Sequence, residues 1–234
     1  MFDDDTALKV IKRCKPNSRA TAYYALKFIY NAYGEELGLQ HSDVVPKSVR
    51  KHKEILLPDE VNQIIDRVRD YEPPHVQFLF VLATVYGLRR VEIYRLEKGD
   101  IDLKRETFFV FTAKGGEPRE HIIHDIVKPY FKKFMEIKKP KYRFIQELNM
   151  LFDVIADRAE VELRPRLGWH SIRRCLITEL MKTNVNPMII RDFLRWKPRT
   201  SDILMEYTLY NPAEVDKMIF DVHPFLGRWK VTNY

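Results

Sequence analysis

Side chains that can together break a phosphodiester bond follow one another in a telling order along this chain. Arg89 comes first, then Lys114, then the His-x-x-Arg pair His170 and Arg173, and finally Tyr207. Arginine forks bind phosphate oxygens and stay charged, lysine donates protons when neighbouring cations lower its pKa, and tyrosine supplies a nucleophilic oxygen. The set therefore predicts attack by a tyrosine on a phosphate whose extra negative charge is neutralised by two arginines.

Each residue of this set also has an ordinary explanation when it is taken alone. Arg89 stands three residues before Glu92, the spacing of an ion pair on a helix surface, and Arg90 competes for the same role. Lys114 precedes Gly115-Gly116, so by default it is a solvated residue at a hairpin tip. Only the order and spacing of the whole set favour chemistry over these explanations.

The elements that must position these residues are mostly helices. The segment His75–Tyr86 is almost wholly apolar but too short to span a bilayer, which predicts a buried helix. Two strand-like segments, Thr107–Thr112 and Glu120–Ile123, are joined by Gly115-Gly116 and predict a hairpin. Helices are also expected after Leu57 and at about Ile126–Ile137, Tyr142–Ala159, His170–Lys182, Pro187–Leu194, Ser201–Tyr210 and Pro212–Val222. The fold class is therefore mainly α with a small antiparallel β-sheet (α+β).

The first fifty residues predict a separate, short helical unit. Ser18 can cap a helix that runs to Tyr33 and ends at Gly34. Its apolar face would consist of Tyr23, Leu26, Ile29 or Tyr30, and Tyr33. We accordingly expect a helical unit over residues 1–46, a linker over 47–56 and a larger domain over 57–234. The basic stretch Lys47–Lys53 is either a solvated linker or one that lies along a phosphate backbone.

The composition agrees with a folded, basic protein. Hydrophobic residues make up 45% of the 234 residues, which is enough for a packed core, and the net charge is +7. Cys14 and Cys175 are far apart, which favours a reducing compartment and no disulfide framework. No apolar run is long enough for a membrane span, and the acidic start is unlike a signal peptide. His121 and His124 flank a strand-like apolar pair without a further ligand nearby, so we expect no metal there.

The two arginine motifs, Gly87-Leu88-Arg89-Arg90-Val91-Glu92 and Gly168-Trp169-His170-Ser171-Ile172-Arg173-Arg174, are the most specific features. With the hairpin lysine between them and the tyrosine after them, the chain resembles the tyrosine recombinase (phage integrase) family from about Leu57 to the end. The resemblance implies the catalytic-domain fold of that family. It also implies a site-specific recombinase that cuts and rejoins duplex DNA through a 3′-phosphotyrosyl intermediate.

The resemblance also assigns a role to each residue of the set. Arg89 and Arg173 would clamp the phosphate, and Lys114 would protonate the 5′ leaving oxygen. His170 would assist proton transfer at the tyrosine, and Tyr207 would attack. No cofactor and no metal are expected, since the arginines neutralise the charge.

The chain departs from the family's usual pattern near its tyrosine. Trp196, in Leu194-Arg195-Trp196, stands where most members have Gly-His, and some members use a Trp there to donate its indole N–H to the phosphate. Trp196 is also two residues farther from Tyr207 than usual. Tyr210 lies one helical turn after Tyr207, so either hydroxyl can be the nucleophile. We favour Tyr207 because the apolar residues before it resemble the family's approach to its tyrosine.

Partners follow from the same resemblance. Relatives clamp duplex DNA between a helical core-binding domain and the catalytic domain, and the first fifty residues resemble only the last part of the former. The chain is therefore either a fragment or a minimal member. Family members act as tetramers on two synapsed duplexes, so we expect a monomer or dimer when the protein is free, in a prokaryotic cytoplasm and away from membranes. The segment Pro212–Val222 would dock into a neighbour or pack on its own domain.

Two other functions remain open from the sequence. A type IB topoisomerase shares the Arg, Lys, Arg and Tyr set but relaxes supercoils without directed strand exchange. A catalytically silent DNA-binding accessory protein is the other possibility, and the complete set of candidate residues speaks against it.

Overall fold

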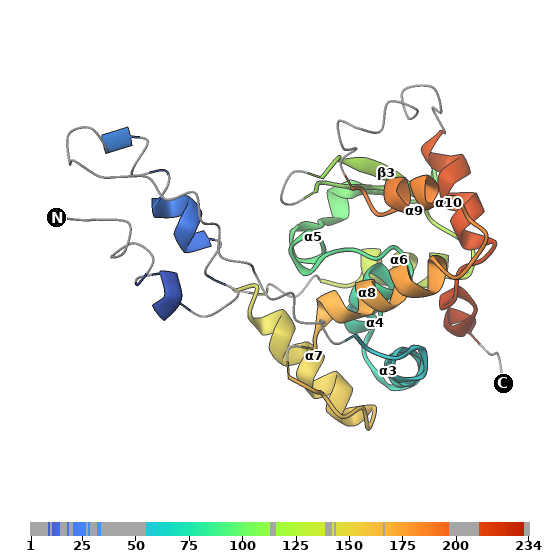
Figure 1. Ribbon diagram of the computed structural model, residues 1–234. Coiled ribbons are helices and arrows are strands. Elements are labelled where there is room, and N and C mark those ends of the chain that lie inside the picture. Colours follow the sequence, from blue (N-terminus) through green and yellow to red (C-terminus); the bar gives the residue numbers. More distant parts are fainter. Residues whose placement is uncertain are drawn as a thin grey trace. The chain divides into compact units, whose positions relative to one another are not determined.

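The computed structural model describes residues 9, 11–14, 18, 21–26, 28, 32–33, 55–112, 116–138, 142, 144–165, 167–196 and 211–231. The chain divides into two compact units, residues 1–53 and 54–234 (Figure 1), which are described separately.

The first unit is helical where the structure describes it. Residues 11–13, 21–26 and 32–33 are helical. Tyr23 is buried, as the apolar pattern predicts, but Tyr33 is 54% exposed and its expected place on the buried face is wrong. Gly34, position 29, position 30 and the basic stretch 47–53 lie outside the described residues.

The second unit opens with two helices that form the centre of its core. Helix α3 (Pro58–Tyr71) has proline in its first turn, and the backbone N–H of Leu57 donates to the carboxylate of Glu60 over 2.6 Å. The predicted face of α3 is buried: Val61, Ile64, Ile65 and Val68. Helix α4 (Pro74–Thr84) is buried along nearly its whole length, which confirms the prediction from its apolar sequence.

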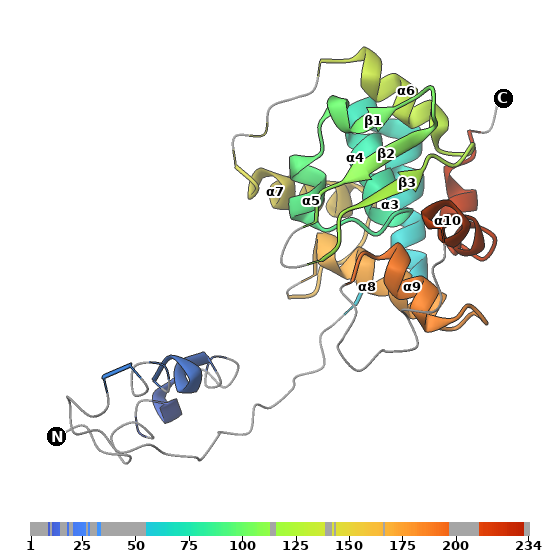
Figure 2. The same ribbon diagram turned by 90° about the horizontal axis from the view of Figure 1, so that it is seen from above.

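A three-stranded antiparallel sheet with the order β1-β2-β3 covers part of this core. Its strands are β1 (Ile101–Asp102), β2 (Thr107–Val110) and β3 (Arg119–Ile122), and Phe108 pairs with His121. Strands β2 and β3 confirm the predicted hairpin with slightly different ends. The sequence missed β1, because a two-residue strand has no alternation to detect. Figure 2 shows the strands over α4, and Tyr86 at the end of that helix contacts Phe108.

The remaining chain is helical, so the class is mainly α with a small antiparallel sheet. The elements are α5 (Arg90–Arg95), η2 (Lys98–Asp100), α6 (Lys128–Glu136), α7 (Glu147–Arg158), α8 (Trp169–Leu180), α9 (Pro187–Phe193), α10 (Pro212–Phe220) and η4 (Leu226–Trp229). The expected start of α7 at Tyr142 is wrong. The hydroxyl of Tyr94 donates to the Tyr142 carbonyl, which would otherwise accept a helical hydrogen bond. The expected helix 201–210 lies outside the described residues.

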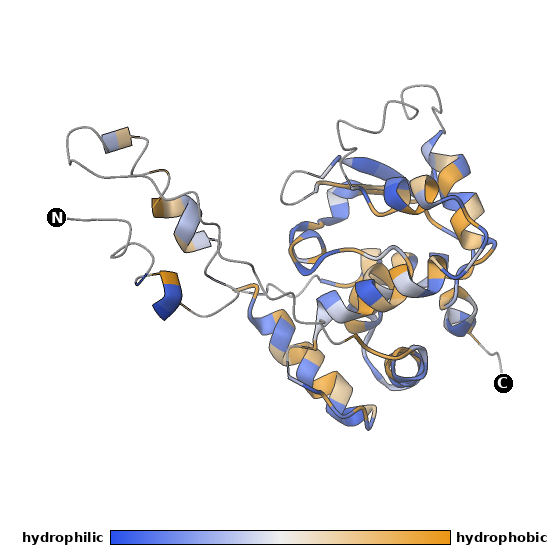
Figure 3. Ribbon diagram, viewed as in Figure 1, coloured by the Kyte–Doolittle hydropathy of each residue, from blue (hydrophilic) through white to orange (hydrophobic). Residues whose placement is uncertain are grey.

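Helix α10 packs on its own unit. Val215 and Ile219 are buried, and the helix contacts α9 and β3, whereas Met218 faces outward. Figure 3 shows both hydrophilic and hydrophobic residues along α10. Of the two possibilities left open by the sequence, the structure favours packing within the unit. No helix in the described part of the chain combines the length and the apolar character that crossing a bilayer requires.

Candidate active site

Arg89 lies at the start of α5, immediately after a tight connection from α4. Gly87 has a φ of 57°, which glycine adopts without strain, and a Cβ there would meet the Leu194 side chain at 2.8 Å. The Arg89 backbone N–H donates to Glu92 over 2.7 Å, and its guanidinium donates to the same carboxylate over 2.6 Å. The local fold thus both caps α5 and fixes the Arg89 side chain.

Arg173 is buried on α8 and ties two loops together. Its guanidinium donates to the carbonyl of Gly87 and, over 2.7 Å, to the carbonyl of Leu194. Burial lowers the pKa of Arg173 well below its usual value, and repulsion from Arg195 and Arg89 lowers it further. A bound anion would favour the charged guanidinium and so offset these effects, which makes the position suited to a negatively charged ligand.

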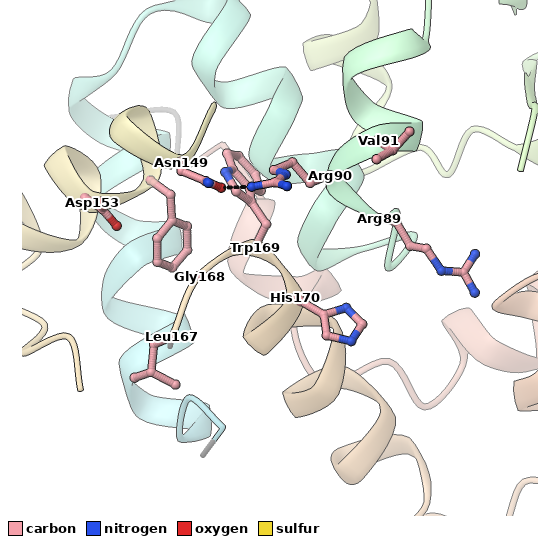
Figure 4. A pocket seen from close by; sticks show the side chains of 10 residues that line it. Arg89, Arg90, Val91, Asn149, Asp153, Leu167, Gly168, Trp169 and His170 are labelled. Carbon is pink, nitrogen blue, oxygen red and sulfur yellow. Dashed lines mark hydrogen bonds between the residues drawn. The ribbon is translucent and has the colours of Figure 1, made fainter. Parts of the chain in front are cut away.

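His170 is exposed on α8, one turn before Arg173. It lines a pocket of about 660 Å³ together with Arg89. In Figure 4 the His170 and Arg89 side chains point to the same side, whereas Arg90 turns the other way and donates to Asn149. The geometry therefore favours Arg89 over Arg90 as the arginine that faces a ligand beside His170.

The first turn of α8 is fixed by aromatic packing. The Trp169 indole N–H donates to the Leu148 carbonyl over 2.6 Å, and its ring lies 4.6 Å from that of Phe80 between centroids. Trp169 is fully buried by these contacts from α7 and α4. Because Trp169 is locked in place, the direction of the neighbouring His170 is set by the core.

Trp196 follows α9 and covers the buried arginine. The Cζ atom of Arg173 lies 5.8 Å from the centroid of the Trp196 ring, within the range of a cation–π contact. Trp196 itself is 37% exposed. The structure therefore brings Arg89, His170, Arg173 and Trp196 to one region of the second unit.

Three candidate residues, Lys114, Tyr207 and Tyr210, lie outside the described residues. The described residues nearest to the lysine in sequence are Thr112 and Gly116, and a Cβ on Gly116 would lie 2.6 Å from the Arg195 carbonyl oxygen. Gly116 is thus packed against the backbone of the residue before Trp196.

A buried polar network, which no sequence pattern predicted, lies behind this region. Arg195 is fully buried, and its guanidinium contacts Glu92 at 3.3 Å and His121 Nε2 at 2.6 Å. The other nitrogen of His121 lies 3.1 Å from both carboxylate oxygens of Asp216, which also accepts from Arg119 over 2.5 Å. His121 therefore has partners inside the protein. Among the described residues, no group of three or more His, Cys, Asp or Glu side chains is arranged to hold a metal ion.

The described side chains of this region carry more positive than negative charge. Among the described residues, Arg89, Arg173 and Arg195 all lie around the Glu92 carboxylate, which pairs with Arg89 and Arg195. Burial alone would raise the pKa of Glu92, but Arg195 and Arg89 outweigh it, so the pKa is lowered and the group is ionised at neutral pH. The excess of positive charge can neutralise a phosphate group.

Comparison with known proteins gives a consistent family. A model of the phage integrase family matches residues 54–213. Tyrosine recombinase XerA of Thermococcus onnurineus (strain NA1) is 24% identical over 184 residues, which are 71% of this chain and 61% of that protein. Tyrosine recombinase XerC of Halalkalibacterium halodurans is 26% identical over 170 residues, which are 64% of this chain and 56% of that protein. The chain thus spans about three fifths of the length of these relatives.

Solved structures share the fold. A lambda integrase dimer bound to a COC′ core site has a TM-score of 0.63 at 16% identity, over 87% of this chain and 76% of that one. The Tn1549 transposon integrase in complex with circular intermediate DNA has a TM-score of 0.63 at 15% identity, over 92% and 82%. Crystalline XerA recombinase has a TM-score of 0.53 at 19% identity, over 92% and 79%. At these identities the likeness concerns the fold alone.

Proposed function

This chain belongs to the phage integrase family of tyrosine recombinases, and we propose that it cuts and rejoins duplex DNA as a site-specific recombinase or integrase. The observation that carries the proposal is the convergence of Arg89, His170 and Arg173 on one region with an excess of positive charge. A single surface ion pair between Arg89 and Glu92 would not need two further arginines, Arg173 and Arg195, from separate segments of the chain.

In the proposed reaction the Tyr207 oxygen attacks a backbone phosphorus. The bond between phosphorus and the tyrosine oxygen forms as the bond to the 5′ oxygen breaks, which leaves a 3′-phosphotyrosyl link and a free 5′ hydroxyl. His170 takes the tyrosine proton and Lys114 gives a proton to the leaving 5′ oxygen. Arg89 and Arg173 neutralise the non-bridging oxygens in the transition state.

Rejoining is the reverse of cleavage. A 5′ hydroxyl attacks the phosphotyrosyl link, Lys114 accepts its proton, and the tyrosine leaves with a proton from His170. The Trp196 indole, packed over Arg173, would donate to a phosphate oxygen. The reaction requires no energy source because the phosphotyrosyl ester keeps the energy of the broken bond. Arginines supply the charge that a metal supplies in other phosphate-transfer sites.

Double-stranded DNA is the proposed partner, and two solved structures of the same fold were obtained with DNA. We further propose that residues 57–234 form the catalytic domain, that residues 47–56 link it to the helical unit 1–46, and that four chains assemble on two duplexes.

Metal-free incubation with DNA tests the proposal. Supercoiled plasmid and end-labelled linear duplex are incubated with the protein in a chelator, and the products are separated by denaturing electrophoresis. A protein-linked 3′ end supports the proposed chemistry. Plasmid relaxation without exchange between two duplexes would favour the topoisomerase alternative. DNA binding with neither adduct nor relaxation, over duplexes that include the protein's own genomic flanks, would favour the accessory alternative.

A further inference from the structure

Arg195 combines complete burial with an unfavourable backbone conformation. Its φ is 59°, in the left-handed region that side chains other than glycine rarely adopt. Burial lowers the pKa of Arg195 to about 10, so the guanidinium still carries its charge at neutral pH. A charged side chain is stable in such a place only when its contacts offset both the strain and the loss of water.

On one side, the Arg195 guanidinium contacts Glu92, the carboxylate that binds Arg89. Arg89 and Arg173 together are called the phosphate clamp. The Nη2 atom of Arg195 lies 3.3 Å from a Glu92 oxygen, and neither side chain is exposed. The same carboxylate receives both the backbone N–H and the guanidinium of Arg89. Glu92 therefore contacts both Arg195 and Arg89, and its carboxylate holds the Arg89 side chain in place.

On the other side, the guanidinium contacts His121, which in turn contacts Asp216 on α10. Its Nη1 atom lies 2.6 Å from Nε2 of His121, and Nδ1 of His121 lies 3.1 Å from the Asp216 carboxylate. Burial lowers the pKa of His121 to about 4, so the ring is neutral. The network assigns its proton to Nδ1, which donates to Asp216, while Nε2 accepts from Arg195.

We propose that Arg195 is a positioning residue of the clamp: it holds the Glu92 carboxylate in the orientation that aims Arg89 at phosphate, and it joins that carboxylate to α10 through His121. The inference rests on the proposed function, because it assigns Arg89 to the scissile phosphate. It adds that the conformation of the clamp depends on a cation buried inside the second unit.

The ionisation of Glu92 offers a direct measure of this role. Among the described residues, the charged groups that face the carboxylate are Arg89 at the start of its helix, Arg195 after α9, Arg173 from α8, and Arg95 and Asp100, which line a small cavity with it. Burial opposes its charge, and Arg195 is the largest of the influences that favour it. Loss of Arg195 must therefore raise the pKa of Glu92, and a protonated carboxyl holds Arg89 less firmly.

The first experiment titrates Glu92 in the free protein by NMR of ¹³C-labelled glutamate carboxyls. Arg195→Met is compared with wild type and with Arg158→Met, which removes an arginine from another buried carboxylate, Glu72. We expect the pKa of Glu92 to rise in Arg195→Met and to stay unchanged in Arg158→Met. An unchanged Glu92 titration in Arg195→Met would overturn the inference. If Arg195→Met does not fold, Arg195→Gly removes the same charge and accepts the φ of 59° without strain.

The second experiment measures single-turnover DNA cleavage against pH. A misplaced clamp should slow cleavage by Arg195→Met about 10- to 100-fold, with a much smaller change in DNA affinity. The acidic limb of its pH profile should move to higher pH. In a Glu92→Gln background, Arg195→Met should cause no further loss, because the residue acts through Glu92. The inference would be contradicted if the rate losses of Arg195→Met and Glu92→Gln multiplied in the double variant and the acidic limb of the Arg195→Met profile did not move.

The two experiments separate failure of the inference from failure of the proposed function. Wild-type protein that forms no adduct would count against the proposed function, while the Glu92 titration would still decide whether Arg195 controls that carboxylate.

Discussion

A β-carbon on Gly116 would lie 2.6 Å from the carbonyl oxygen of Arg195. Real Cβ atoms do not approach backbone oxygens this closely, so the hairpin reaches its place only because residue 116 has no side chain. The contact joins the segment that follows Lys114 to the segment that precedes Trp196. Two parts of the proposed active site, some eighty residues apart in sequence, are thus placed by one close backbone approach.

Gly116→Ala should therefore impair cleavage. The added methyl group forces the hairpin away from Arg195 and displaces Lys114, which should slow single-turnover cleavage about 10- to 100-fold. Overpacking of this kind should also lower the free energy of unfolding by about 1–3 kcal/mol. Gly99→Ala is the matched control, because nothing lies within 4 Å of a Cβ at that position. Equal cleavage rates for the two alanine variants would show that the close approach has no bearing on the reaction.

Substitution of a clamp arginine should slow DNA cleavage much more than substitution of an arginine outside the site. Loss of one preorganised charge at a transition-state oxygen typically costs about 10²–10³-fold in rate, and we expect Arg89→Ala to lose at least that much. Arg89→Lys should recover little, since an ammonium cannot match the fork that contacts Glu92. Arg105→Ala removes an exposed arginine and should cleave at the wild-type rate. Cleavage rates are measured on a nicked suicide duplex, and an active Arg89→Ala protein would rule out this residue as a clamp.

The sequence predicted those elements in which a residue pattern repeats along the chain. It did not predict contacts between single residues that are far apart in the sequence. Periodic apolar residues predicted α3 and α4, and Gly115-Gly116 between two strand-like runs predicted the hairpin. No local pattern marks Arg195, His121 or Asp216, because their partners are about 74 to 103 residues away in the chain. Glu92 was recognised only as a neighbour of Arg89. One signal was available: Arg195 stands where the resembling family usually has a glycine, and its φ of 59° explains why a glycine suits that position.

Stability should fall in mild acid because of a buried histidine. Burial lowers the pKa of His223 to about 4, while the ring accepts hydrogen bonds from the N–H groups of Phe225 and Leu226. In the unfolded chain the His223 imidazole is protonated below a pKa of about 6.5. In the folded protein the same imidazole stays neutral until the pH falls to about 4. The stabilisation is therefore complete above pH 6.5 and lost as the pH falls to 4, by about 3 kcal/mol for this residue.

Urea unfolding between pH 7 and pH 4 measures this effect. His223→Asn keeps an acceptor near the two N–H groups but cannot titrate. We expect the variant to be less stable than wild type at pH 7 and to lose less stability on acidification. A parallel decline of the two proteins would exclude His223 as a source of the acid sensitivity.

The basic stretch 47–53 should contribute phosphate contacts. Each lysine or arginine that neutralises a phosphate adds about −0.9 to the slope of log affinity against log salt concentration. Replacement of Lys47, Arg50, Lys51 and Lys53 by glutamine should make the slope clearly shallower. Fluorescence anisotropy with duplex DNA over a range of salt concentrations gives the slope. A slope identical to that of wild type would mean that this stretch is a solvated linker.

The most direct test of the proposed chemistry is identification of the residue that carries DNA after cleavage. Trypsin releases Tyr207 and Tyr210 on one peptide, since no lysine or arginine lies between Arg199 and Lys217. Fragmentation of that peptide from a trapped covalent complex locates the attached nucleotide. We expect the nucleotide on Tyr207, no adduct in Tyr207→Phe, and a normal adduct in Tyr210→Phe. A nucleotide on Tyr210, or an adduct that persists in Tyr207→Phe, would contradict the assignment of the nucleophile. An adduct on a residue other than tyrosine would contradict the proposed chemistry itself.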